Sequence, residues 1–264
     1  MSYSRSFISL LKEIVLIINR DMEIISATTV GGNFSLRVCD VKYAQKGYKV
    51  LIDDIEYKIE SVDFNNKTIV VSGSVIPSVT FFRLYPVYFF HGTPRETATE
   101  ISNPDHANLI TPMVFLNETF EEGVSFDDLS AIDRVVKPGI YALGQRPEDK
   151  FSKDLQEFYV NPMRRLMELL IKTAKGQTQL FDMTDYKTSL VNYSKFGVYV
   201  TNAGVKKNLF AIPLAGCSNI GDIGLYATDE ECCGSKCKTD TNRILNEDGS
   251  YCLGENYYFT NHEN

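Results

Sequence analysis

Residues 48–59 read YKVLIDDIEYKI, and this stretch decides how the N-terminal part of the chain folds. Hydrophobic residues alternate with polar ones on both sides of Asp53-Asp54: Tyr48, Val50 and Ile52 precede it, and Ile55, Tyr57 and Ile59 follow it. A period of two is typical of a β-strand with one buried face. Aspartate tolerates the left-handed backbone of a tight turn. The stretch therefore predicts two short antiparallel strands joined by a turn.

The alternation continues outward from this hairpin, from Met22 to about Leu84, and turn residues interrupt it. Asn65-Asn66, for example, separates the second strand of the hairpin from a strand that begins near Thr68. Short strands with frequent turns predict a small antiparallel β-barrel or a sandwich, and we expect the barrel.

The N-terminal segment has a different period. Between residues 4 and 19, hydrophobic residues recur at the spacing of one helical face: Phe7, Leu10, Leu11, Ile14, Ile17 and Ile18. This pattern predicts an amphipathic helix. Its apolar face must be covered, and we favour packing on its own domain over docking on a neighbouring subunit. The helix and the barrel together form the first predicted domain, residues 1–85.

Pro86 opens a second predicted domain, residues 86–227, in which helices and strands are mixed. Residues 87–90 predict a strand, and Thr93-Pro94-Arg95-Glu96 predicts the start of a helix that runs to about Ser102. Threonine can cap a helix, proline suits its first position, and glutamate three residues after the cap can complete a capping box. An antiparallel sheet with helices packed on it follows, and the chain as a whole is predicted to be α+β.

Shorter patterns predict the remaining elements of this domain. Strands are expected at residues 113–116, 131–136, 198–200 and 209–214, and polar loops at residues 121–128 and 141–150. Asn161-Pro162 is expected to divide a helical stretch into a short helix, residues 153–159, and a longer one, residues 162–175. The longer helix has one apolar face, which consists of Met163, Leu166, Leu170 and Ala174.

The charge balance bears on the class of partner. The 264 residues include 27 Lys and Arg against 34 Asp and Glu, which gives a net charge of -7. Neutralising a phosphate backbone requires a basic face, so this balance argues against a dedicated nucleic-acid-binding protein. The apolar N-terminal stretch is interrupted by Lys12 and Glu13 and is too short to span a bilayer. It also lacks the cleavage site of a secretory signal, so we expect an unsecreted protein without a membrane segment.

Most of the cysteines gather near the C-terminus. After residue 227 the composition shifts to Cys, Gly, Asn, Asp and Glu, which predicts a loop-rich extension, residues 228–264, that needs outside support to be ordered. Cys232, Cys233, Cys237 and Cys252 could hold a structural zinc ion, although their spacing does not match a paired C-x-x-C site. Disulfides and free thiols are the alternatives, and we expect no other cofactor.

The sequence contains no familiar catalytic motif. A Walker A loop, a G-x-S-x-G elbow and a G-x-G-x-x-G fingerprint are all missing. The three histidines, His91, His106 and His262, are far apart in the chain. His91 precedes Gly92 at a strand-to-helix turn, where we expect it to make a structural hydrogen bond. We therefore expect no enzymatic activity.

Several short segments resemble neck and tail proteins of bacteriophages. They read TPMVFL at residues 111–116, IDRVV at 132–136, YVNPM at 159–163, YSKFG at 193–197, NLF at 208–210 and PLAG at 213–216. The order of a helix, a small barrel and a mixed domain is also similar to that group. The likeness is to tail or baseplate proteins of phages that infect Bacteroidetes, including the crAss-like phages.

The resemblance implies a tail-terminator-like α/β sandwich for residues 86–227 and a structural role. Such a protein would form a homo-oligomeric ring of about six or twelve subunits in the neck or tail of a virion that is assembled in the host cytoplasm. Its partners would be the portal, other neck or tail proteins, and genomic DNA that passes without sequence-specific contact. Polar loops at residues 121–128 and 141–150 would reach the neighbouring subunits. The alternatives are a baseplate or host-facing adhesion module and a zinc-dependent enzyme that uses the C-terminal cysteines.

Overall fold

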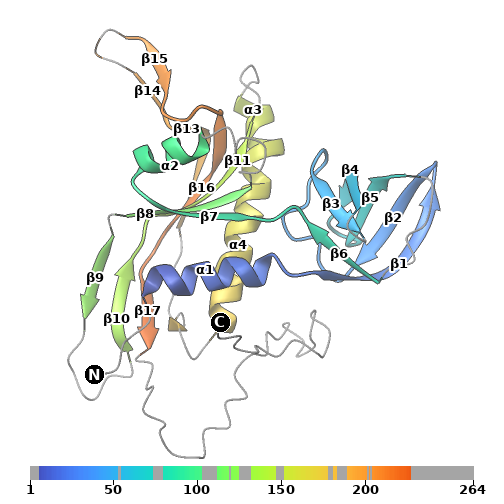
Figure 1. Ribbon diagram of the computed structural model, residues 1–264, viewed down its shortest axis with the longest axis horizontal. Coiled ribbons are helices and arrows are strands. Elements are labelled where there is room, and N and C mark those ends of the chain that lie inside the picture. The colour runs from blue at the N-terminus through green and yellow to red at the C-terminus, as the bar shows by residue number, and fades with distance from the viewer. Residues whose placement is uncertain are drawn as a thin grey trace, which may run out of the picture. The chain divides into compact units, whose positions relative to one another are not determined.

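The computed structural model describes residues 6–52, 55–73, 80–102, 112–118, 120–124, 132–146, 152–177, 181–182, 189–200, 202 and 204–226. The chain forms two compact units. The first contains residues Asn19–Tyr85, and the second contains α1 (Phe7–Ile18) together with residues Pro86–Ala227. In Figure 1 the first unit is coloured blue to teal, and the second, apart from the blue α1, runs from green to orange.

The first unit is a closed barrel. Its strands are β1 (Met22–Val30), β2 (Asn33–Val38), β3 (Lys49–Ile52), β4 (Ile55–Asp63), β5 (Thr68–Ser72) and β6 (Phe81–Leu84). They pair antiparallel in the order β1-β2-β5-β4-β3-β6, and β6 returns to β1. The alternating residues on the two sides of Asp53-Asp54 therefore become β3 and β4. The prediction of a small antiparallel barrel is confirmed.

Alternation places one set of side chains inside the barrel. Phe34, Leu36 and Val38 of β2 are buried, and so are Ile69 and Val71 of β5. Their neighbours in sequence are half-buried or exposed. Closure pairs both edges of the sheet, which protects it from pairing with other strands.

Asp63 holds the turn between β4 and β5. Its carboxylate accepts hydrogen bonds from the backbone N–H groups of Asn65 and Asn66, each at 3.0 Å, and from the side-chain amide of Asn66 at 2.8 Å. The bonds from Asn66 contribute most to holding the pKa of Asp63 below its ordinary value. The left-handed residue is Lys67, with φ 50°. The asparagines serve as hydrogen-bond donors in this turn, and Lys67 supplies its left-handed backbone.

The second unit contains two larger sheets. One has the order β13 (Ser189–Phe196), β16 (Leu214–Ile220), β11 (Ile140–Gln145), β8 (Met113–Asn117) and β7 (Tyr88–Gly92). Its strands are antiparallel except for β7 and β8, which are parallel. The other has the order β12 (Phe181–Asp182), β17 (Ile223–Tyr226), β10 (Ile132–Lys137) and β9 (Glu121–Val124). Strands and helices together confirm the α+β class.

Both predicted loops of this unit contain strands instead. Residues 121–124 form β9, and residues 141–145 belong to β11. Ala142 and Leu143 are fully buried, because β11 lies between β8 and β16 in the sheet, although the glycine, proline and charged residues of 141–150 suggested a loop. Residues 125–128 and 147–150 lie outside the described part of the chain.

The predicted strand at residues 209–214 was also wrong. Residues 209–213 bend, and β16 begins only at Leu214. Two residues explain the bend. The Phe210 side chain is buried in the core, and Pro213 has no N–H group to donate to a neighbouring strand.

The capping box of α2 (Pro94–Ile101) is present as predicted. The Thr93 hydroxyl accepts a hydrogen bond from the Glu96 N–H at 3.2 Å, and the Glu96 carboxylate accepts one from the Thr93 N–H at 2.8 Å. Two N–H groups at the helix start are therefore satisfied by side chains.

A continuous helical stretch runs from α3 (Ser152–Leu155) through a π-helical turn, η1 (Gln156–Val160), to α4 (Asn161–Gly176). The prediction that Asn161-Pro162 divides it was wrong. In a regular α-helix the proline ring would collide with the carbonyl four residues earlier. In the widened turn the Asn161 N–H donates to the Gln156 carbonyl, which accommodates the proline without a break. The predicted apolar face is buried, namely Met163, Leu166, Leu170 and Ala174.

Helices cover both faces of the five-stranded sheet. α4 contacts β11 and β16 on one face. On the other, Ala98 and Ile101 of α2 join a core cluster with Met113, Phe115 and Leu143. α1 packs against α4 and β7, so its apolar face is buried within the chain, but on the second unit and not on the barrel with which it was expected to form a domain. The structure groups this helix with residues 86–227 rather than with the barrel. None of the described helices has the length and apolar character needed to cross a membrane.

Candidate functional site

The cysteines predicted as zinc ligands, Cys232, Cys233, Cys237 and Cys252, lie outside the residues that the structure describes. Within the described ranges, no three side chains of the His, Cys, Asp and Glu types form a group that could hold a metal ion. Cys217 is buried in β16, and burial raises the pKa of its thiol to about 12. This thiol is therefore protonated at neutral pH and is a poor nucleophile.

The histidines are not brought together by the described part of the fold. His91 is exposed on β7, whereas His106 and His262 lie outside the described residues. The pKa of Glu96 is lowered mainly by its hydrogen bonds with Thr93, and its electrostatic interaction with His91 lowers it further. The expected structural hydrogen bond of His91 stays a prediction.

A row of aromatic rings lies on the sheet face that α2 covers. This aromatic cluster consists of Phe115, Tyr141, Tyr193, Phe196 and Phe210. Ring centroids are separated by 5.5 Å between Phe115 and Tyr141, 5.2 Å between Tyr141 and Phe196, and 5.6 Å between Phe196 and Phe210. Tyr193 lies 5.5 Å from Phe196. Aromatic pairs at such separations contribute about 1 kcal/mol each beyond the area they bury.

Part of the aromatic cluster reaches the surface. Phe115 and Phe210 are buried, whereas Tyr141, Tyr193 and Phe196 are only partly buried. Burial, with a smaller contribution from Tyr193, raises the pKa of Tyr141 and keeps its hydroxyl neutral. Neutral aromatic side chains with a polar tip are enriched at protein interfaces.

A hairpin next to this cluster stands apart from the two larger sheets. β14 (Val198–Val200) and β15 (Lys206–Asn208) form a two-stranded sheet of their own. This hairpin arm, residues 198–208, projects outward beyond β13 (Figure 1). Val205 and Leu209, at the two ends of β15, are 53% and 39% exposed. Because an isolated two-stranded ribbon is only marginally stable in water, the arm would gain stability by pairing with another surface.

The base of the arm is anchored in the core. Gly197 has φ +73°, and a Cβ atom at this position would lie 2.5 Å from the Phe210 ring, so only glycine fits. The Leu209 N–H donates to the Gly197 carbonyl at 2.9 Å, which joins the two ends of the arm. The Arg146 N–H donates to the Pro213 carbonyl, also at 2.9 Å. The direction in which the arm leaves the sheet is thereby set.

No family model and no curated protein matches this chain. What the arm and the aromatic cluster do therefore follows from their own geometry and charge.

The sequence did not predict the contact between Gly197 and Phe210 that anchors the arm. Residues 193–197 and 208–210 were noted for their resemblance, and residues 209–214 were expected to be a strand. A signal was nevertheless present. Gly197 directly follows Phe196, and Phe210 lies at the far end of the same hairpin. A glycine inside strand-like sequence between two aromatic residues indicates a close approach of ring and backbone.

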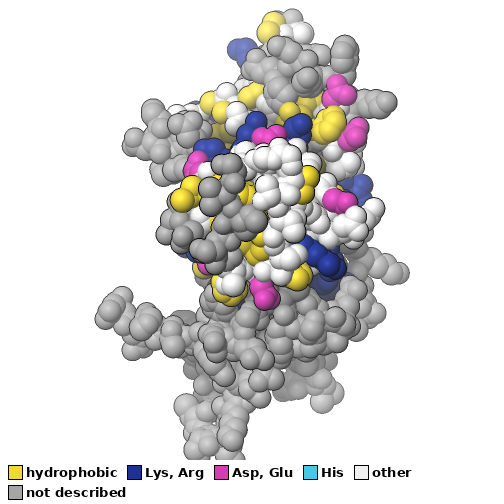
Figure 2. All heavy atoms as spheres, turned by 90° about the vertical axis from the view of Figure 1, so that its right-hand side faces the viewer, with side chains coloured by type: hydrophobic (Ala, Val, Ile, Leu, Met, Phe, Trp, Pro, Cys, Tyr) yellow, Lys and Arg dark blue, Asp and Glu magenta, His cyan; other side chains and the backbone are white. Residues whose placement is uncertain are grey.

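Basic and acidic side chains are interspersed on the face shown in Figure 2. Ion pairs on the barrel show the same mixture: Lys49 lies 2.6 Å from Glu56, and Lys58 lies 4.0 Å from Glu60. These pairs are exposed, and such pairs contribute little to stability. Among the residues drawn in colour, this face does not offer the continuous basic track that a nucleic-acid backbone requires.

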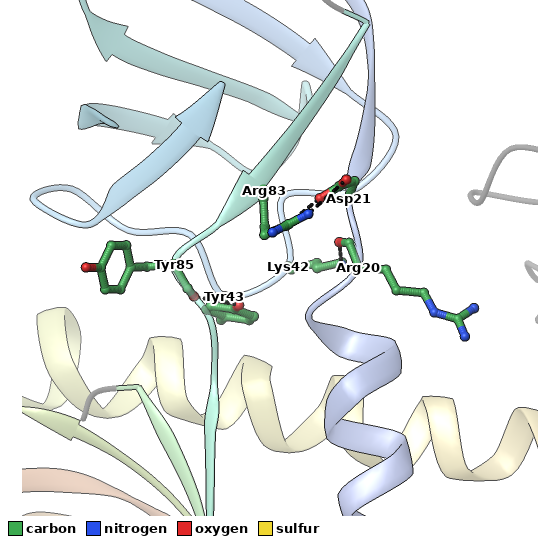
Figure 3. Close-up of polar contacts among 6 residues, drawn as sticks. All are labelled: Arg20, Asp21, Lys42, Tyr43, Arg83 and Tyr85. Atoms are coloured by element: carbon green, nitrogen blue, oxygen red, sulfur yellow. Dashed lines mark hydrogen bonds and ion pairs between the residues drawn. The ribbon is translucent and has the colours of Figure 1, made fainter. Parts of the chain in front are cut away.

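A set of polar contacts joins the first and last strands of the barrel to the loop before β3 (Figure 3). Arg83 donates to both carboxylate oxygens of Asp21, from Nε at 2.6 Å and from a terminal nitrogen at 3.2 Å. The buried Tyr43 hydroxyl donates to the Tyr85 carbonyl at 3.0 Å, and Lys42 Nζ donates to the Arg20 carbonyl at 3.3 Å. This clasp, formed by Asp21, Lys42, Tyr43 and Arg83, holds together the points where the chain enters and leaves the barrel.

Proposed function

We propose that this protein is a structural subunit of a bacteriophage virion. It forms a ring in the head-tail neck or upper tail, joins the portal to the tail, and lines or seals the DNA channel. In this proposal residues 86–227 correspond to a tail-terminator-like α/β sandwich, and the barrel is an added module. The role is mechanical and requires no covalent chemistry.

One observation carries the proposal: most of the segments that resemble phage neck and tail proteins gather at one place in the fold. Residues 113–116 lie in β8, residues 193–197 contain the end of β13, residues 208–210 follow the arm, and residues 213–216 lead into β16. Together they supply four of the seven buried residues of one core cluster, namely Met113, Phe115, Phe210 and Leu214, and Phe196 packs against this cluster. The resemblance therefore coincides with the anchor of the hairpin arm.

A ring subunit needs a rigid wall and an element that reaches its neighbour. The two sheets and α4 supply the wall. The loop at residues 141–150 was expected to reach the neighbour, but much of it is β11 in the middle of a sheet. The hairpin arm takes over that role, because it projects from the sheet and has an exposed hydrophobic residue at each end of β15.

The charge of the chain also supports a place beside the DNA channel. A net charge of -7 favours a wall that repels phosphate, so that DNA can slide past without sticking. Contact with the genome would then be independent of its sequence, in agreement with the interspersed charges in Figure 2.

The mass of the native protein in solution, measured with and without zinc chelation and followed by electron microscopy, tests this proposal. A closed ring, formed alone or only when a portal or tail protein is added, would support it. A compact monomer that holds stoichiometric zinc and never assembles would contradict it and favour a zinc-dependent enzyme. Binding of the isolated monomer to cell-surface glycans would contradict it in favour of a host-facing adhesion module.

A further inference from the structure

We propose that the hairpin arm of one subunit adds a strand to the edge of β9 in a second copy of this chain, so that copies join head to tail. The inference rests on the proposed function and identifies the contact that would close the ring. It involves pairing of backbone groups along a strand edge, guided by opposite charges on the two partners.

The arm is basic. Lys195, Lys206 and Lys207 lie in it or next to it, and residues 195–210 contain no acidic residue. Lys195 and Lys207 are exposed. The arm therefore combines a strand that lacks a sheet with positive charge and, in Val205 and Leu209, exposed hydrophobic surface.

β9 has the opposite charge and an edge that can accept a strand. Among the strands that the structure describes, it is the last of its sheet, and it pairs with β10 on one side. Glu118 and Glu121 are exposed, and the side chain of Glu121 retains 82% of its surface although it lies 3.6 Å from Lys137. Among the side chains that the structure describes beside this edge, Glu118 and Glu121 are acidic and only Lys137 is basic.

The other strand edges of the second unit suit the arm less well. β13 carries Lys195 and would repel a basic arm. β12 has only two residues, which is too short to align a strand. β7 is contacted by α1. Charge and length therefore both favour β9, whose four residues are enough to pair with the three of β15.

The acceptor must belong to a second copy. In Figure 1 the arm and the β9–β10 pair lie at opposite ends of the second unit, so the arm cannot reach β9 of its own chain. A contact between two different surfaces is heterologous, and repeating it produces a ring when the rotation closes. In such a ring, each subunit would be joined to the next by strand pairing between its arm and the neighbour's β9.

Paired charge reversal in the full chain tests this contact. One variant is Lys206→Glu with Lys207→Glu, another is Glu118→Lys with Glu121→Lys, and a third combines all four changes. The control, Lys12→Glu with Lys46→Glu, makes the same charge change as the first variant at exposed positions outside both surfaces. Particle mass is measured across protein concentration, and circular dichroism reports whether each variant is folded.

We expect each double variant to weaken self-association at least about tenfold, because like charges then face each other across the contact. The fourfold variant, and a mixture of the two double variants, should assemble again, whereas the control should behave as wild type. Rescue in the fourfold variant also shows that the double variants had not merely misfolded.

The two proposals fail in different ways. If the wild type forms rings and both folded double variants do so with unchanged affinity, the contact between arm and β9 is wrong while the ring subunit stands. The same holds if the double variants lose assembly and the fourfold variant does not regain it. If the wild type never assembles, even with portal or tail proteins, the proposed function fails and this inference fails with it.

Discussion

Gly197 is the point at which the sheet ends and the hairpin arm begins. Replacing it with alanine places a methyl group against the Phe210 ring and strains a backbone with φ +73°. We expect Gly197→Ala to destabilise the second unit by about 2–3 kcal/mol, because overpacking adds to the cost of left-handed backbone. Denaturant unfolding measures the loss, and limited proteolysis should show earlier cleavage in residues 198–208.

A second glycine provides the matched control. Gly204 has nearly the same backbone angle, φ +75°, but nothing lies within 4 Å of its added Cβ atom. Gly204→Ala should therefore cost only the backbone part, about 1 kcal/mol. Equal losses in the two variants would show that contact with Phe210 does not matter, whereas partial recovery in Gly197→Ala with Phe210→Leu would show that it does.

Cys217 offers a test of the thiol chemistry. With a pKa of about 12, it has almost no thiolate at pH 8, and it is also buried. We expect a small alkylating reagent to leave Cys217 unmodified in the native protein and to modify it fully after unfolding in guanidinium. Peptide mass spectrometry distinguishes it from the other cysteines. Rapid native labelling would contradict its burial and reopen a catalytic role.

Among the secondary-structure elements, the start of α2 links stability to pH. The pKa of Glu96 is lowered by its hydrogen bonds with Thr93, so ionised Glu96 favours the folded chain. This contribution is present above the ordinary pKa of a glutamate and is lost as the pH falls through the lowered value. We expect the stability difference between wild type and Glu96→Gln to shrink between pH 7 and pH 3.

Thermal unfolding at several pH values measures this difference. Glu100→Gln, in the same helix but outside the capping box, is the control, and its difference from wild type should change less with pH. A difference for Glu96→Gln that stays constant down to pH 3 would contradict the role of the ionised capping box.

The clasp of the barrel can be tested through Tyr43. Burial raises the pKa of Tyr43, so its hydroxyl stays a neutral donor to the Tyr85 carbonyl. Tyr43→Phe keeps the ring and removes this hydrogen bond, and we expect a loss of about 1 kcal/mol in the free energy of unfolding. Tyr57→Phe, on a half-buried ring that packs against Phe34, should change stability by less than about 0.5 kcal/mol. Similar losses in both variants would argue against the clasp.

Sequence patterns succeeded where each element has one buried face. The alternation of residues 48–59 and the helical spacing of residues 162–175 both report a boundary between core and solvent, and both elements are present. Patterns failed where that boundary is missing. β11 is packed on both faces and uses small residues, so it resembled a loop, and Phe210 turns inward from what resembled a strand. The anchor of the arm depends on a contact between Gly197 and Phe210. The glycine in strand-like sequence indicates a close approach, but it does not identify Phe210 as the ring that approaches.

For the whole molecule, we predict that the C-terminal extension, residues 228–264, serves assembly more than folding, because a composition rich in Cys, Gly, Asn, Asp and Glu is typical of a loop-rich segment. We expect a chain truncated after Ala227 to keep its circular dichroism spectrum and its cooperative unfolding but to bind a portal or tail partner more weakly. Spectroscopy and particle mass measure the two properties separately. Unfolding of the truncated chain would show that residues 228–264 are part of the folded core.

The pairing of β1 with β6 has a mechanical consequence. The chain enters the barrel just before Met22 and leaves it just after Leu84, and these two strands are antiparallel neighbours. Tension on the chain before Met22 and after Leu84 would pull β1 and β6 apart from this end, one hydrogen bond after another. The ion pair between Arg83 and Asp21 and the hydrogen bond from Tyr43 lie at that end. If the protein serves in a virion as proposed, the clasp would be the first part of the barrel to carry the load from the packed genome, and strand separation would begin only after the clasp breaks.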